Sequence, residues 1–137
     1  MIRIKYDMDI MNYMSLFETV TGAKLKDCIL GERLLFIVEE GQMGKAIGKK
    51  GINVRKIEDV LKKKVKLVEF SSDMLQFIRN YIYPLKVNEV KQEQDIVLIS
   101  APDTNTRSLL IGRDRNNLNE LMSIVKRYFE IETIKVV

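Results

Sequence analysis

The hydrophobic and polar positions of this chain follow one pattern that occurs twice. In the first occurrence, apolar residues at helical or alternating spacing predict a helix, two strands, two helices and a strand. The predicted elements span about residues 8–21, 24–30, 33–39, 43–47, 52–63 and 65–70. Gly22 ends the first helix, and Gly31-Glu32 joins the two strands as a hairpin. Residues 1–6 also alternate and are predicted to add an edge strand.

The second occurrence lies about 64 residues further along the chain. At this offset Ile47-Gly48 falls on Ile111-Gly112, and the apolar residues of the flanking segments match in series. A helix capped near Asp73 and ended by Pro84 begins this copy. The elements predicted after it span about 85–91, 95–100, 106–111, 116–129 and 133–137. The repeat indicates a duplicated domain, with one copy in residues 1–70 and the other in residues 71–137.

Each copy has the element order α-β-β-α-α-β. This order predicts an α+β fold in which a three-stranded sheet is covered by helices on one face. A chain of 137 residues is long enough for two such small domains, and 46% hydrophobic residues are enough to fill their cores.

Composition restricts the environment in which the protein works. No apolar run approaches the length needed to span a bilayer, and the charged, alternating start is unlike a signal peptide. The single cysteine, Cys28, cannot form an internal disulfide, which favours a reducing compartment. We therefore expect a cytoplasmic protein that does not contact a membrane.

The chain contains no histidine, so the commonest general base and the commonest transition-metal ligand are both missing. The carboxylates are scattered, and adjacent residues such as Glu58-Asp59 do not face each other on a helix. We therefore expect no catalytic residues, no metal site, no cofactor and no small-molecule substrate.

Positive charge gathers around one turn. Residues 41–66 contain nine basic and two acidic residues, whereas the whole chain has a net charge of +4. At the centre of this stretch, Gly48-Lys49-Lys50-Gly51 connects two predicted helices. Glycines at both ends would let another backbone come close, and the lysines add charge beside the N–H groups that begin the next helix. This combination is typical of a site for a phosphodiester backbone.

Residues 44–54, which contain this turn, resemble the characteristic turn and flanking helices of the KH family of single-stranded nucleic-acid binders. The element order is similar to the type II arrangement of that family, and the whole chain resembles the short archaeal NusA-like transcription factors. The resemblance implies two tandem KH domains that bind single-stranded RNA and act with RNA polymerase on elongation, pausing or termination. It also implies that the first turn clamps about four nucleotides. The expected RNA-binding residues are Lys45, Ile47, Gly48, Lys49, Lys50, Gly51, Ile52, Asn53, Arg55 and Lys56.

The second copy departs from the family pattern. Its turn reads Gly112-Arg113-Asp114-Arg115, so an arginine stands in place of the second glycine. Arg115 brings a side chain to a position where contact with bare backbone is expected. Gly112, Arg113 and Arg115 therefore form only a secondary RNA-binding candidate. The alternative is that this copy supports the first one or docks on a protein.

Other interpretations compete with RNA binding. The main alternative is a docking module on RNA polymerase or a ribosomal particle with weak affinity for RNA. A nucleotide-hydrolysing phosphate loop fits poorly, because Gly44 and Gly48 are separated by three residues where four are needed, and Lys50 stands where Ser or Thr would hold magnesium. Ile47, Ile52 and Val54 are candidates for the walls of a base-binding groove, although such positions more often belong to a core.

Overall fold

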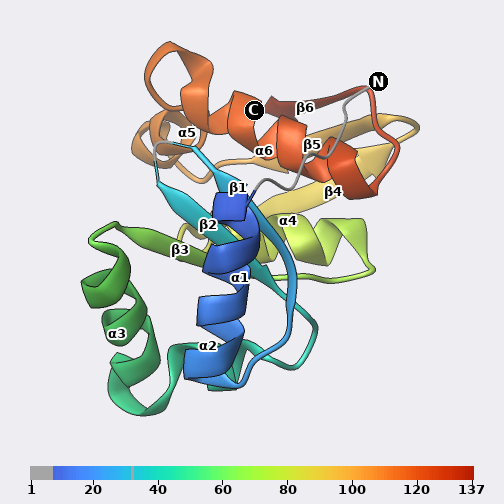
Figure 1. The fold of residues 1–137 in the computed structure, drawn as a ribbon. Coiled ribbons are helices and arrows are strands. Elements are labelled where there is room, and N and C mark those ends of the chain that lie inside the picture. Colours follow the sequence, from blue (N-terminus) through green and yellow to red (C-terminus); the bar gives the residue numbers. More distant parts are fainter. Residues whose placement is uncertain (1–7, 32) are drawn as a thin grey trace. The chain divides into compact units, whose positions relative to one another are not determined.

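The computed structural model describes residues 8–31 and 33–137, and the edge strand predicted for residues 1–6 lies outside this part of the chain. The chain divides between Phe70 and Ser71 into two compact units (Figure 1). Each unit contains one three-stranded sheet, and the two sheets have the same pairing of strands. The predicted α+β class with two copies of α-β-β-α-α-β is confirmed.

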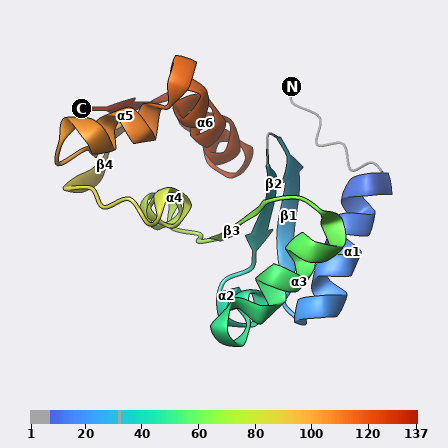
Figure 2. The same cartoon turned by 90° about the vertical axis from the view of Figure 1, so that its left-hand side faces the viewer.

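The first unit contains α1 (Met8–Thr21), β1 (Leu25–Leu30), β2 (Leu34–Val38), α2 (Met43–Ile47), the short 3-10 helix η1 (Lys49–Gly51), α3 (Ile52–Leu61) and β3 (Val65–Glu69). Strand β2 lies between β1, to which it is antiparallel, and β3, to which it is parallel. The helices α1 and α3 lie on one face of this sheet (Figure 2). Every residue of β2 is buried, and Leu34, Phe36 and Val38 belong to the core cluster that includes residues of the helices.

The core of the first unit joins the sheet to the helices. Phe36 of β2 packs against Phe17 of α1, with ring centroids 4.4 Å apart, and Ala46 of α2 and Ile57 of α3 belong to the same buried cluster. Helix α1 ends where the N–H of Gly22, at φ 73°, donates to the carbonyl of Glu18 over 2.8 Å. The helices that flank the basic turn are thus anchored through Ala46 and Ile57, which fixes the turn between them.

The second unit contains α4 (Met74–Ile82), β4 (Glu89–Glu93), β5 (Ile96–Ser100), α5 (Thr104–Ile111), the 3-10 helix η2 (Arg113–Arg115), α6 (Asn116–Tyr128) and β6 (Thr133–Val136). Strand β5 is central, antiparallel to β4 and parallel to β6. Side-chain caps begin two of its helices: the carboxylate of Asp73 accepts from the N–H of Leu75, and that of Asp103 accepts from the N–H of Thr106.

Four predicted boundaries are wrong by two to four residues, and one of them is the strand end predicted at residue 91, which lies at Glu93. The strand predicted from residue 85 begins at Glu89, because the N–H of Leu85 is held by the carbonyl of Ile82 in a turn that follows α4. The helix predicted from residue 106 begins at Thr104, since Asp103 caps it. The helix predicted to end at residue 63 ends at Leu61, where the next residue takes a left-handed conformation.

Candidate nucleic-acid interface

The basic turn between α2 and α3, Gly48–Gly51, is called here the first turn. Its backbone reverses direction through three residues with positive φ: Gly48 (φ 74°, ψ 171°), Lys50 (φ 55°, ψ 28°) and Gly51 (φ 75°, ψ 17°). The N–H of Gly48 donates to Gly44 over 3.0 Å, and that of Gly51 donates to the carbonyl of Gly48 over 3.1 Å. These bonds fix the shape of the turn before any ligand binds.

Gly48 lacks a side chain for a reason inside the protein. A Cβ atom at this position would lie 2.7 Å from the side-chain amide of Asn53. That amide donates to the carbonyl of Lys45 over 2.8 Å, so Asn53 ties the start of α3 to the end of α2. Asn53 thus occupies the space that a side chain at residue 48 would need, and the expected role of Gly48 in RNA binding stays a prediction.

Gly51 differs, because a Cβ atom built there would meet nothing within 4 Å. The residue has a left-handed backbone and precedes α3 without a side-chain cap for the first N–H groups of the helix. The N–H of Ile52 bonds to Lys49, and the N–H groups that follow it point toward the open end of the helix. Gly51 is thus the place where a ligand can approach the backbone of the first turn.

Cations surround this approach. Lys49 and Lys50 in the turn are exposed, as are the flanking Lys45 and Lys56. Within residues 8–31 and 33–137, no carboxylate forms an ion pair with any of these four lysines. The guanidinium of Arg55 is used differently, since it donates to the carbonyl of Lys50 over 2.9 Å and so supports the turn.

Two large apolar side chains flank the cations. Ile47 at the end of α2 is 40% exposed, and Ile52 at the start of α3 is 45% exposed, so neither belongs to the core. Val54, the third candidate wall residue, is half-buried. An exposed isoleucine on each side of a charged turn is an apolar contact surface of the kind that a nucleic-acid base can cover.

The corresponding turn of the second unit, Gly112–Arg115, is called here the second turn. Its backbone dihedral angles at Gly112, Asp114 and Arg115 lie within 12° of those at Gly48, Lys50 and Gly51. Asn117 repeats the contact of Asn53, because its amide donates to Leu109 over 2.8 Å and lies 2.6 Å from where a Cβ of Gly112 would be. The loss of the second glycine therefore leaves the shape of the turn unchanged.

The two turns differ in charge and in side chains. Residues 45–56 contain five basic and no acidic residues, whereas residues 109–120 contain two of each. Asp114 stands where the first turn has Lys50, and the exposed Arg115 stands where it has Gly51. Glu120 accepts a hydrogen bond from the hydroxyl of Tyr81 and thereby links α6 to α4. The second turn keeps the scaffold of the first without its open, cationic surface.

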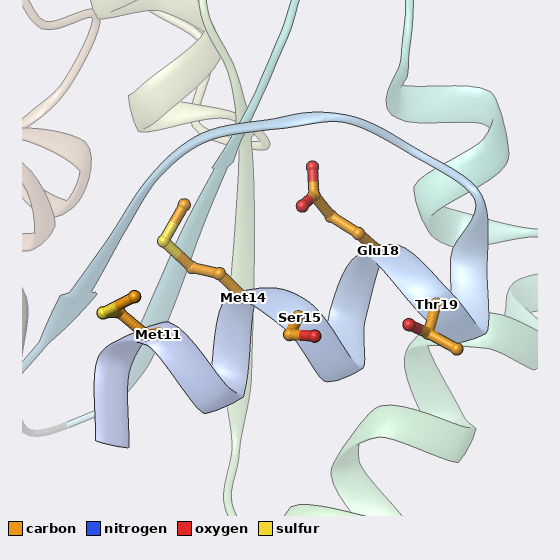
Figure 3. A pocket seen from close by; sticks show the side chains of 5 residues that line it. All are labelled: Met11, Met14, Ser15, Glu18 and Thr19. Carbon is orange, nitrogen blue, oxygen red and sulfur yellow. The ribbon is translucent and has the colours of Figure 1, made fainter. Parts of the chain in front are cut away.

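A hollow elsewhere in the first unit lacks the features of a phosphate site. It has a volume of about 450 Å³ and is lined by Met11, Met14, Ser15, Glu18 and Thr19, all from α1 (Figure 3). None of the lining residues that the structure describes is basic, and the carboxylate of Glu18 accepts from the N–H of Leu25. Its chemistry therefore does not suit an anion.

The described residues also bear on metals and membranes. No cluster of three or more potential metal-ligating residues occurs among them. None of their helices combines the length and the apolar character that crossing a membrane demands.

Comparisons with known proteins agree with this geometry. Residues 12–95, which include the first turn, match the model of the KH domain family. The chain is 33% identical to the "Probable transcription termination protein NusA" of Methanocaldococcus jannaschii, in an alignment that covers 100% of this chain and 77% of the relative. It is 36% identical to the protein of the same name from Methanococcus vannielii, covering 99% of this chain and 81% of that one. This chain is a KH protein of the archaeal NusA-like family.

The fold comparison extends the likeness to both units of this NusA-like protein. The crystal structure of APE1850 matches it with a TM-score of 0.74 at 25% identity, covering 96% of this chain and 100% of the other. Sequence reasoning missed the positioning role of the two asparagines in the NusA-like chain. The repeat offset was the available signal, since it aligns Asn53 with Asn117.

Proposed function

We propose that this NusA-like protein binds single-stranded RNA through its first turn and acts as a transcription factor on elongation, pausing or termination by RNA polymerase. The observation that carries the proposal is the open, cationic approach to the backbone at Gly51. The relatives named as probable transcription termination proteins support the biological context. A factor of this kind would work in the cytoplasm beside the polymerase, without chemistry of its own.

In the proposed mechanism, a phosphate lies against the bare backbone at Gly51 and accepts hydrogen bonds from the N–H groups that begin α3. Lys49 and Lys50 supply neutralising charge on either side, and Lys45 and Lys56 extend the cationic path. Asn53 and Arg55 act as positioning residues that hold the turn in its binding shape. Bases pack against the apolar side chains of Ile47, Ile52 and Val54.

The second turn adds little to RNA binding in this proposal. Arg113 and Arg115 remain available as charged donors, but Asp114 opposes them and Arg115 has a side chain where the first turn has a glycine. The equal numbers of basic and acidic residues in residues 109–120 favour the alternative role, docking on a protein, for the second unit.

The test is the double substitution Lys49→Asp with Lys50→Asp, assayed by titrating the full chain into a random single-stranded oligoribonucleotide. We expect binding to be lost while the unfolding midpoint stays within a few degrees of the unmodified protein, because both side chains are exposed. The matched control is Lys63→Asp with Lys64→Asp, which makes the same charge change about 15 Å away at the other end of α3. If both double variants lose affinity equally, the attraction is a general effect of net charge and the first turn is not the binding site.

A further inference from the structure

A groove in the second unit lies between β6 and the helices that flank the second turn. It has a volume of about 390 Å³. Four side chains from α5, η2 and α6 and the whole of β6 form its walls: Arg107, Ile111, Arg115, Leu118 and residues 133–137. All four residues of β6 and Val137 after it line the groove, so the groove follows the direction of the chain in β6.

Among the residues that the structure describes, strand β6 is at the edge of its sheet and pairs with β5 alone (Figure 1). Val137 donates its N–H to Ile99 and accepts from the N–H of Ala101, both over 2.9 Å. Backbone groups of a strand alternate in direction, so those of Ile134 and Val136 face away from β5 toward the open edge. Within residues 8–31 and 33–137 no hydrogen bond engages these outward groups, so the groove offers N–H and C=O groups to an additional strand.

The charges in the groove all have one sign. Arg107, Arg115 and Lys135 are exposed cations, and none of the described residues that line the groove has an acidic side chain. The remaining lining side chains are apolar apart from that of Thr133. An occupant that matches this lining carries both carboxylates and apolar side chains.

The wider charge distribution disfavours a polyanion as that occupant. Residues 71–137 contain nine basic and nine acidic residues, so the second unit has no net attraction for a long phosphate chain. Arg115 also fills the place that bare backbone takes in the first turn. A carboxylate reaches out on its own side chain and pairs with a guanidinium without needing such a close approach.

We propose that this groove binds an extended protein segment in which acidic and apolar residues alternate. The segment adds to the edge of β6 as a fourth strand, and its carboxylates pair with Arg107 and Arg115. The second unit is then a protein-docking module beside an RNA-binding one. This inference goes beyond the proposed RNA function and does not depend on it.

The experiment uses the full chain labelled with ¹⁵N and two probes in separate titrations. One probe is a pool of ten-residue peptides in which Glu or Asp alternates with Val or Ile, and the other is a random ten-nucleotide single-stranded RNA. We expect the peptide pool to shift the amide resonances of Ile134 and Val136, and the RNA pool to leave them unchanged. A pool with Gln and Asn in place of the acids should bind at least tenfold more weakly.

Two variants test the two kinds of contact in the proposed docking separately, the ion pairs and the backbone hydrogen bonds. Arg107→Gln with Arg115→Gln, both exposed, should weaken peptide binding at least tenfold, whereas Lys86→Gln, an exposed residue outside the groove, should not. Val136→Pro removes one outward N–H and should weaken peptide binding without changing RNA affinity. Binding of RNA at the β6 amides, or no peptide-dependent shift there, would overturn the proposal, whatever the outcome at the first turn.

Discussion

Replacing either glycine of the first turn by alanine should lower the free energy of unfolding, but the loss should be larger at Gly48 than at Gly51. At Gly48, φ 74° with ψ 171° lies in a region open almost only to glycine, and forcing another residue into it costs on the order of 1–3 kcal/mol. The new Cβ would also lie 2.7 Å from the amide of Asn53, which has to move away. Moving it breaks the 2.8 Å bond to Lys45, worth about 1 kcal/mol.

At Gly51 only the left-handed backbone opposes alanine, at a cost of about 1–2 kcal/mol, because the added Cβ meets nothing within 4 Å. Loss of glycine's freedom in the unfolded chain offsets about 0.4–1 kcal/mol in both variants. We therefore expect Gly48→Ala to lower the free energy of unfolding by about 2–3 kcal/mol and Gly51→Ala by about 1 kcal/mol or less. Urea titration followed by circular dichroism measures both values.

Asn53 supplies the decisive control for this reasoning. If the clash with its amide causes part of the loss, Gly48→Ala and Asn53→Ala should not be additive, and the double variant should recover about 1 kcal/mol of the summed cost. The pair Gly112→Ala and Asn117→Ala provides the same cycle in the second unit, where the amide lies 2.6 Å away. Equal losses for Gly48→Ala and Gly51→Ala, or additivity within about 0.3 kcal/mol in both cycles, would refute the assigned role of the asparagines.

Three further predictions concern affinity, salt and pH. The substitution Gly51→Arg gives the first turn the arginine that the second turn has at this position. We expect a folded protein whose affinity for single-stranded RNA, measured by fluorescence titration, is about tenfold lower. An unchanged affinity would show that RNA binding does not need bare backbone at residue 51. The logarithm of the RNA affinity should fall with the logarithm of the salt concentration, by about 0.7 for each phosphate that the protein contacts. Lys49→Gln with Lys50→Gln removes two such contacts and should reduce this slope by about 1.4. A slope that does not change would mean that these lysines do not contact phosphates. Burial, with a contribution from the charge of Asp27, raises the pKa of the Cys28 thiol to about 12. The ordinary pKa of a cysteine thiol is 9.0, so the stability from the neutral thiol is complete below about pH 9 and is lost as pH rises toward 12. Cys28→Ala should flatten this alkaline loss in urea titrations relative to the unmodified protein, and identical pH profiles would contradict it.

Much of the fold could be predicted from the sequence because local signals, such as glycines that end helices, agreed with the spacing of the apolar residues. The helix that ends at Gly22 and the short helix from Met43 to Ile47 have the predicted bounds, since glycines end both. The sequence predicts that β4 begins at residue 85, four residues before its actual start, because Leu85 and Val87 alternate with polar residues as strand residues do. Their apolar pattern could not reveal that the backbone there first turns, with the N–H of Leu85 bonded to Ile82.

The candidate site was predictable in outline but not in its internal contacts. A two-glycine motif with lysines identified the place and the charge, since both are properties of adjacent residues. The contact of Asn53 with Gly48 and Lys45 depends on the angle between two helices, which no local pattern contains. For the same reason, the sequence could not show whether Ile47 and Ile52 lie in the core or on the surface. Their exposure in the fold places both on the surface.

The second turn separates the shape of this motif from its ligand chemistry. Two sequences with different charge, GKKG and GRDR, adopt nearly the same backbone because each is held by an asparagine five residues after its first glycine. Arg115 keeps φ 63° at the cost of a left-handed conformation for a residue with a side chain. The first glycine and the asparagine therefore determine the fold of the turn, while the second glycine and the central lysines determine what can approach it. A chain duplicated in this way can change the partner of one copy by substituting exposed residues, without rebuilding the core beneath them.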